Sequence, residues 1–104
     1  MAEFVDVGPL DQLPPGNAMV ATVEGKSVAL FNVDGTIYAM DDSCVHAGAS
    51  LGAGKLAGKI VTCRAHGLRY DVTTGKVTST PELGVKSYPV KVVSGRIMVG
   101  VSKQ

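Results

Sequence analysis

Short apolar runs separated by turn residues form the main pattern along this chain. Valine, isoleucine, threonine and tyrosine recur in runs that each end at glycine, asparagine, aspartate or proline. This alternation is typical of an all-β domain. It predicts strands over residues 18–23, 27–33, 37–40, 59–62, 69–72, 85–93 and 96–101.

Turn residues between these runs predict antiparallel pairing. Glu24-Gly25-Lys26, Asp34-Gly35 and Ser94-Gly95 each separate two neighbouring runs, and Asp-Gly is among the strongest short hairpin signals. The chain has 13 glycines, and each would cost up to about 1 kcal/mol inside a helix. We therefore expect a single all-β domain over 1–104, built of antiparallel sheets and without a long helix.

Two segments do not follow the strand pattern, and they contain every cysteine and histidine of the sequence. Segment 42–58 is rich in glycine, alanine and serine, and segment 63–68 lies between two predicted strands. The first contains Cys-Val-His at 44–46 and the second contains Cys-Arg-Ala-His at 63–66. Loops held by a rigid sheet commonly carry functional side chains. The pairing of one thiol with one imidazole in each loop predicts a metal centre.

The order of the four side chains bears on which metal they bind. Thiolates suit iron–sulfur clusters, zinc and copper(I), and imidazoles suit zinc, iron and copper. Structural zinc sites usually pair cysteine with cysteine and histidine with histidine. Here each loop offers one of each, which suits a two-iron centre whose two irons take different ligands. A zinc-stabilised binding module remains open at this point.

Taken one at a time, these residues have simpler interpretations. His46 or His66 alone would fit a surface histidine, and Cys44 or Cys63 alone would fit a small buried apolar residue. The coincidence of all four, at two short spacings, favours a metal centre over these interpretations.

Composition and charge exclude several other functions. The net charge of +1 comes from scattered lysines and arginines, which argues against nucleic-acid binding. No apolar run approaches the roughly 20 residues of a membrane span, and no signal peptide begins the chain; we expect a cytoplasmic protein that does not enter membranes. No nucleophile–base pair or phosphate-binding loop is evident, so we expect no enzyme activity.

Three charged residues close to the two segments have two interpretations. Asp41, Asp42 and Arg64 could form a docking surface or be ordinary exposed charges.

The two loops resemble those of the Rieske iron–sulfur family. The resemblance lies in Cys-Val-His-Ala-Gly-Ala-Ser-Leu at 44–51 and Cys-Arg-Ala-His-Gly-Leu-Arg-Tyr-Asp at 63–71. Together they give the pattern Cys-x-His-x16-Cys-x-x-His. Residues 70–75 and Tyr-Pro-Val at 88–90 also resemble soluble Rieske ferredoxins, and the likeness extends over about 18–101.

The resemblance implies a fold, a cofactor and a ligand set. The fold would be the all-β Rieske fold, with cluster-binding loops at about 42–58 and 63–70 forming a small subdomain at the tip. The cofactor would be one [2Fe-2S] cluster per chain. Its ligands would be Cys44, His46, Cys63 and His66, with one iron taking the two thiolates and the other the two imidazoles.

The resemblance also implies a function and partners. The chain would carry single electrons from an FAD- and NAD(P)H-dependent ferredoxin reductase to a terminal Rieske non-haem iron oxygenase, commonly one that hydroxylates aromatic compounds. It would act as a monomer. The alternative in the same family is a small subunit of a larger reductase, such as a nitrite reductase.

Residues around the ligands predict the reduction potential. Two imidazoles in place of thiolates raise it from about −400 mV to between about −150 and +300 mV. High-potential Rieske proteins have a disulfide between the loops, where this chain has Ala49 and Ala65, and a serine where it has Leu68. We therefore expect a potential in the lower part of the range. Tyr70 either donates a hydrogen bond to the cluster or serves only in packing.

Overall fold

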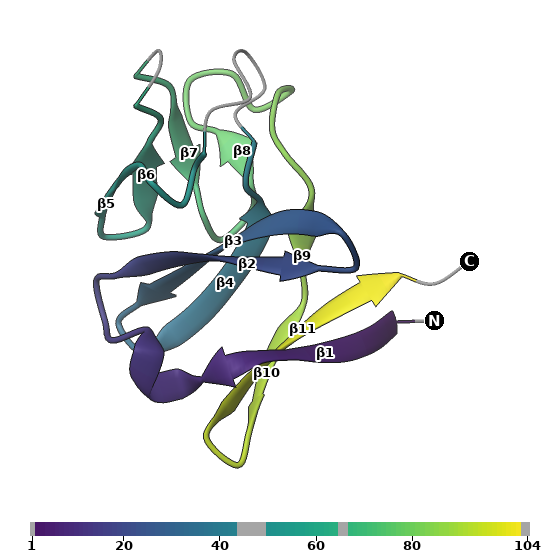
Figure 1. Ribbon diagram of the computed structural model, residues 1–104. Helices are drawn as coiled ribbons and strands as arrows, with labels where there is room; N and C mark the ends of the chain where they lie inside the picture. The colour runs from purple at the N-terminus through teal and green to yellow at the C-terminus, as the bar shows by residue number, and fades with distance from the viewer. Residues whose placement is uncertain (1, 44–49, 65–66, 103–104) are drawn as a thin grey trace.

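The computed structural model describes residues 2–43, 50–64 and 67–102 (Figure 1). Among them the only helical segment is a 3-10 helix, η1 (Leu10–Gln12), and no helix in these ranges is long and apolar enough to cross a membrane. The strands are β1 (Ala2–Pro9), β2 (Ala18–Val23), β3 (Lys26–Val33), β4 (Thr36–Asp41), β5 (Lys55–Ala57), β6 (Ile60–Thr62), β7 (Arg69–Asp71), β8 (Lys76–Val77), β9 (Ser87–Tyr88), β10 (Val90–Val93) and β11 (Arg96–Ser102). The predicted all-β class is confirmed.

The strands form three antiparallel sheets. Their orders are β1-β11-β10, β2-β3-β4-β9 and β5-β6-β7-β8. Figure 1 shows the β2-β3-β4-β9 sheet between the other two, with β5–β8 at one end of the molecule. The first and last strands, β1 and β11, lie at the opposite end of the molecule from β5–β8. We call the β2-β3-β4-β9 sheet the middle sheet.

The three predicted hairpins are confirmed, although Lys26, expected in the first turn, already belongs to β3. Glu24-Gly25, Asp34-Gly35 and Ser94-Gly95 each form a two-residue loop between paired strands. Both residues of every loop have positive φ, between 51° and 95°. This is the conformation of a type I′ turn, whose twist matches that of the strands it joins.

The structure differs from the predicted strands at four places. Lys76–Val77, for which no strand was expected, forms β8 and pairs with β7. Residues 2–9, for which no strand was expected, form β1 and pair with β11. Segment 42–58 is not entirely loop, because β5 (Lys55–Ala57) pairs with β6 there. The expected strand 85–93 is interrupted at Pro89, which has no N–H to donate. As a result β9 joins the middle sheet while β10 pairs with β11.

Strand β3 is buried on both faces and separates two hydrophobic cores. The first core contains Leu13, Val23, Val28, Leu30, Ile37, Ala39, Tyr88, Ile97, Val99 and Val101. The second core contains Ala29, Phe31, Met40, Leu51, Val61, Cys63, Tyr70, Val72 and Val77. Alternate residues of a strand point to opposite faces, so neighbouring positions of β3 contribute to different cores. The second core joins the middle sheet to the β5–β8 sheet.

Candidate metal centre

Cys63 is the predicted ligand that the structure describes, and it directly follows β6. Its thiol is free, and the residue is only 1% exposed within the second core. Its backbone N–H donates to the carbonyl oxygen of Leu68 (2.7 Å), and its carbonyl accepts from the N–H of Gly67 (3.0 Å). Gly67 has φ +71°, a conformation that glycine adopts without steric cost. The described ends of segment 63–68 are therefore held together by backbone hydrogen bonds.

Two further residues close to Cys63 bear on the predicted reduction potential of the cluster. Leu68 is half-buried and packs against the second core. Tyr70 is fully buried at the centre of β7, opposite Val61 on β6 and Val77 on β8. Tyr70 therefore packs in the core, and a hydrogen bond from its hydroxyl to the cluster stays a prediction.

Within the first segment, the residues on either side of 44–49 lie close together. Ser43 and Ser50 form an isolated antiparallel bridge, and the N–H of Leu51 donates to the carbonyl of Asp42 at 2.6 Å. Leu51 is completely buried in the second core. The positions that precede and follow 44–49 are thus fixed to the same core that contains Cys63.

Cys44, His46 and His66 lie outside the described residues, so the ligand set as a whole stays a prediction. The chemistry of Cys63 fits it. A thiolate is a soft ligand suited to iron–sulfur clusters, and this sulfur is buried among apolar side chains with no disulfide partner. Its surroundings would limit water access to a bound cluster, which is one of the ways a protein sets cluster potential.

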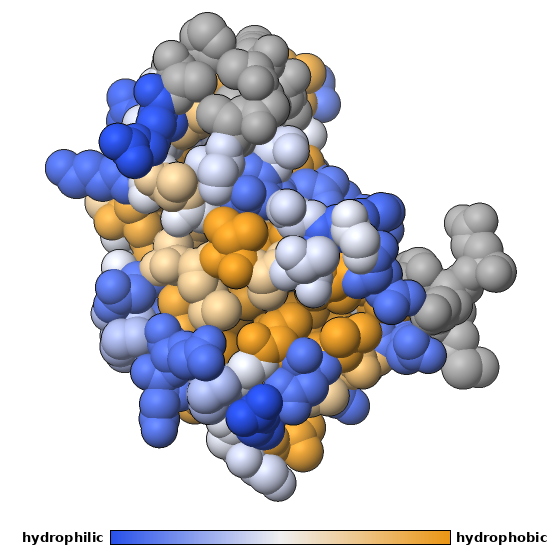
Figure 2. Space-filling view, viewed as in Figure 1, coloured by the Kyte–Doolittle hydropathy of each residue, from blue (hydrophilic) through white to orange (hydrophobic). Residues whose placement is uncertain are grey.

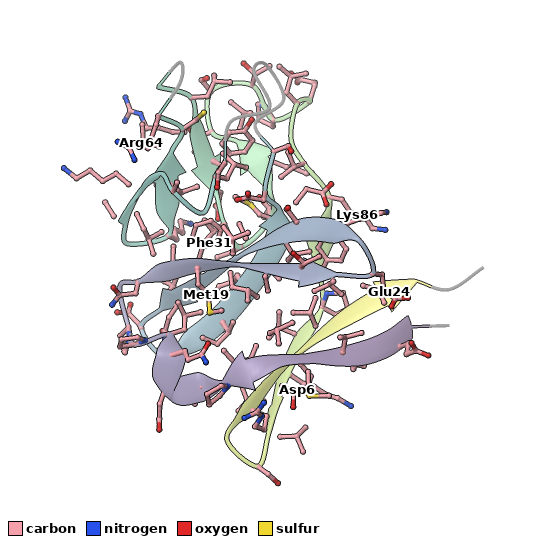
Figure 3. All side chains as sticks on the ribbon, viewed as in Figure 1. Asp6, Met19, Glu24, Phe31, Arg64 and Lys86 are labelled. Atoms are coloured by element: carbon pink, nitrogen blue, oxygen red, sulfur yellow. The ribbon has the colours of Figure 1, made fainter. Side chains whose placement is uncertain are left out.

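Charged residues near these loops differ in their exposure. Arg64 is exposed, and Figure 3 shows its side chain on the outside of the end that carries β5–β8. Asp42, by contrast, is buried, so the idea that it belongs to a docking surface is wrong for this residue. Sequence reasoning missed its role because an Asp beside another Asp looks like exposed charge.

Asp71 closes the turn between β7 and β8. Its carboxylate accepts from the N–H (2.9 Å) and the hydroxyl (2.5 Å) of Thr73, and Lys59 lies 3.5 Å away. Burial opposes ionisation, but the hydrogen bonds from Thr73 and the charge of Lys59 outweigh it, and the pKa of Asp71 is lowered. The Asp71 carboxylate is therefore ionised at neutral pH and keeps this turn closed.

The surface carries apolar side chains as well as charges. Figure 2 shows hydrophobic residues gathered across the middle of the visible face, over the middle sheet, with hydrophilic residues around them. Val20 of β2 is one large apolar residue of the described chain that is substantially exposed, at 42%.

The fold and the two loop segments define the class of protein. Residues 3–89 match the Rieske [2Fe-2S] domain family, and the chain belongs to that family. Its cofactor is therefore a [2Fe-2S] cluster, which confirms the prediction and excludes the zinc alternative.

Relatives within the family narrow the class to ferredoxins. The chain is 39% identical, over 96% of its length and 97% of the relative's, to the ferredoxin component of a naphthalene 1,2-dioxygenase system from Pseudomonas aeruginosa. Among solved structures, it is similar to the ferredoxin of carbazole 1,9a-dioxygenase from Nocardioides aromaticivorans IC177. That match has 35% identity, a TM-score of 0.85, and covers 92% of this chain and 95% of the other.

A second solved structure contains a ferredoxin of this kind together with its oxygenase. It is a complex of reduced oxygenase and oxidised ferredoxin in carbazole 1,9a-dioxygenase, matched with 29% identity and a TM-score of 0.87 over 97% of this chain and 95% of the other. The chain is a Rieske-type ferredoxin, an electron-transfer protein and not a catalytic enzyme, as expected from the sequence.

Proposed function

We propose that this ferredoxin carries single electrons from an FAD-containing, NAD(P)H-dependent ferredoxin reductase to a terminal Rieske non-haem iron oxygenase that hydroxylates aromatic rings. The observation that carries the proposal is the likeness along almost the whole chain to ferredoxin components of dioxygenase systems. The oxygenase as acceptor is supported by the solved ferredoxin–oxygenase complex, one chain of which is similar to this chain over 95% of its length. We also propose that the protein is a cytoplasmic monomer forming one domain over 1–104.

The proposed ligands are Cys44 and Cys63 on one iron and His46 and His66 on the other. When bound, the cluster accepts and gives up one electron at a time. The protein supplies a fixed position for the ligands. Cys63 is held by two backbone hydrogen bonds and by the second core, and support of this kind limits movement of a metal ligand.

The ligand assignment is tested by substitution in the purified, iron-loaded protein. Cys44→Ser and His66→Ala should abolish the rhombic two-iron EPR signal of the dithionite-reduced protein. Arg64→Ala is the control, because Arg64 is exposed and lies within the second loop; it should keep the signal and about two irons and two sulfides per chain. A full cluster in either ligand variant would refute the assignment.

The carrier role is tested by reconstitution. NADH, a flavin-dependent ferredoxin reductase and a ring-hydroxylating oxygenase should form hydroxylated product only when the cluster-loaded chain is present. Product formation at the same rate with Cys44→Ser would contradict the proposal. Support of nitrite reduction in place of hydroxylation would favour the reductase-subunit alternative. Light scattering after gel filtration tests the proposed monomer, which should have the mass of one 10.7 kDa chain.

A further inference from the structure

The side chain of Asp42 joins positions that are far apart along the first segment. Its Oδ1 accepts from the hydroxyl of Ser50 (2.9 Å) and from the backbone N–H of Gly52 (2.7 Å). Its carbonyl accepts from the N–H of Leu51 at 2.6 Å. Asp42 is only 8% exposed, and carboxylates are rarely this buried unless they are well paired. We call Asp42, Ser50 and Gly52 the loop clasp.

The loop clasp is attached to the middle sheet on two sides. The N–H of Asp42 donates to the carbonyl of Ser27 on β3 at 3.1 Å. Gly52 packs against β2, where a Cβ would collide with Cγ2 of Val20 and lie 3.2 Å from the carbonyl oxygen of Met19; Figure 3 labels Met19 on this strand. A larger residue at position 52 would have to displace the Val20 side chain, so glycine permits this close approach.

Other aspartates that accept from backbone N–H groups do so within short turns, although Asp6 also pairs with Arg96 and Asp41 accepts from the Tyr88 hydroxyl. Asp6 accepts from the N–H of Gly8, and Asp71 accepts from Thr73, in both cases two residues further on. Asp42 instead bonds to residues eight and ten positions away. The segment between Asp42 and these partners contains Cys44 and His46. A local turn does not need a buried carboxylate of this reach, whereas closing a whole ligand-bearing loop does.

We propose that Asp42 is a positioning residue for the cluster. Its carboxylate closes the base of the loop that carries Cys44 and His46 and ties this base to β2 and β3. The inference rests on the ligand set of the proposed function. It predicts that loss of the Asp42 acceptor changes how the cluster is held, separately from any change in overall stability.

The test compares Asp42→Ala with Asp42→Asn in the cluster-loaded protein. Alanine removes the acceptor of two hydrogen bonds, whereas asparagine keeps an oxygen at the Oδ1 position. Release of iron to a chelator should be about ten-fold faster in Asp42→Ala, with shifted EPR g values and a changed midpoint potential. Asp42→Asn should restore iron release to within about three-fold of wild type. Ser50→Ala removes only the hydroxyl donor to Asp42. It replaces Asp42→Ala in the test if that variant does not fold.

A matched control separates positioning from general stability. Asn32 is also buried and holds two partners, the carbonyl of Leu13 (2.7 Å) and the N–H of Gly35 (2.8 Å). Asn32→Ala should lower the unfolding temperature yet keep the wild-type EPR spectrum and iron release. Equal iron release in Asp42→Ala and wild type, or equal acceleration in Asn32→Ala, would overturn the inference. A wild-type protein that binds no cluster would instead refute the proposed function.

Discussion

Leu30 and Phe31 are consecutive residues of β3, and each is completely buried in a different hydrophobic core. Leu30 belongs to the first core, shared with β11, and Phe31 to the second core, shared with Cys63. One strand therefore connects the body of the domain to the sheet that supports the metal centre. The same arrangement lets the two cores be perturbed separately.

Substitution of these two residues should separate stability from cluster retention. Phe31→Ala should cost about 3–5 kcal/mol and Leu30→Ala about 2–5 kcal/mol in the free energy of unfolding, through lost burial and cavity formation. Only Phe31→Ala should also speed iron release, because only Phe31 packs in the core that holds Cys63. Denaturant unfolding and chelator assays on the loaded protein measure both. Faster iron release in Leu30→Ala alone would contradict the division into two cores.

Gly67→Ala should disturb the cluster through backbone conformation alone. A Cβ at Gly67 meets no described atom within 4 Å, but φ is +71°, which costs a non-glycine residue about 1–2 kcal/mol. The loop should relax away from its bond to the Cys63 carbonyl, and the midpoint potential should shift. Gly58→Ala is the control, with φ +61° and similarly open surroundings at the β5–β6 turn. It should show the stability loss without the shift in potential.

Leu68→Ser should raise the midpoint potential, because a hydroxyl at this position could donate to the cluster, and hydrogen bonds to cluster sulfurs favour the reduced state. The backbone of Leu68 already contacts Cys63 through the 2.7 Å hydrogen bond. Leu68→Ala controls for lost packing against the second core. Voltammetry measures the midpoint potential of the wild-type protein and of both Leu68 variants. An equal potential in the serine and alanine variants would show that the hydroxyl has no effect.

Ionisation of Tyr88 should lower the free energy of unfolding at alkaline pH. Burial, together with the hydrogen bond to Asp41 (2.5 Å) and its negative charge, raises the pKa of Tyr88 from 10.0 to about 12. The folded state thus holds this proton more tightly than the unfolded state. The resulting stabilisation is complete below about pH 10 and is lost as pH rises towards about 12.

Tyr88→Phe isolates this contribution. It removes the hydroxyl while keeping the ring that packs in the first core and faces the Lys86 ammonium, 5.3 Å from the ring centroid. At neutral pH the variant should be less stable by about 1–2 kcal/mol. The difference from wild type should disappear between pH 10 and 12. A constant difference in urea midpoints across this range would contradict the raised pKa.

Features that depend on residues close together in the chain could be predicted from the sequence. The hairpins at Glu24-Gly25, Asp34-Gly35 and Ser94-Gly95 formed as expected, because each turn type is specified by two residues. The spacing of two cysteines and two histidines predicted a metal centre, and the resemblance of the loop sequences at 44–51 and 63–71 to Rieske proteins implied the family and its cofactor. Strands with an alternating or continuous apolar pattern were also located, to within a few residues.

Pairing between distant segments was decided only by the tertiary structure. β1 is a strand because β11 offers it a partner, and the strand expected over 85–93 is divided because Pro89 lies where the chain passes from the middle sheet to β11. Asp42 appears in the sequence as one of two adjacent charges, yet its partners are eight and ten positions away. The sequence by itself determined the turns, the strand class and the type of metal centre. The two cores and the loop clasp depend on contacts between residues far apart in the chain, which no local pattern encodes.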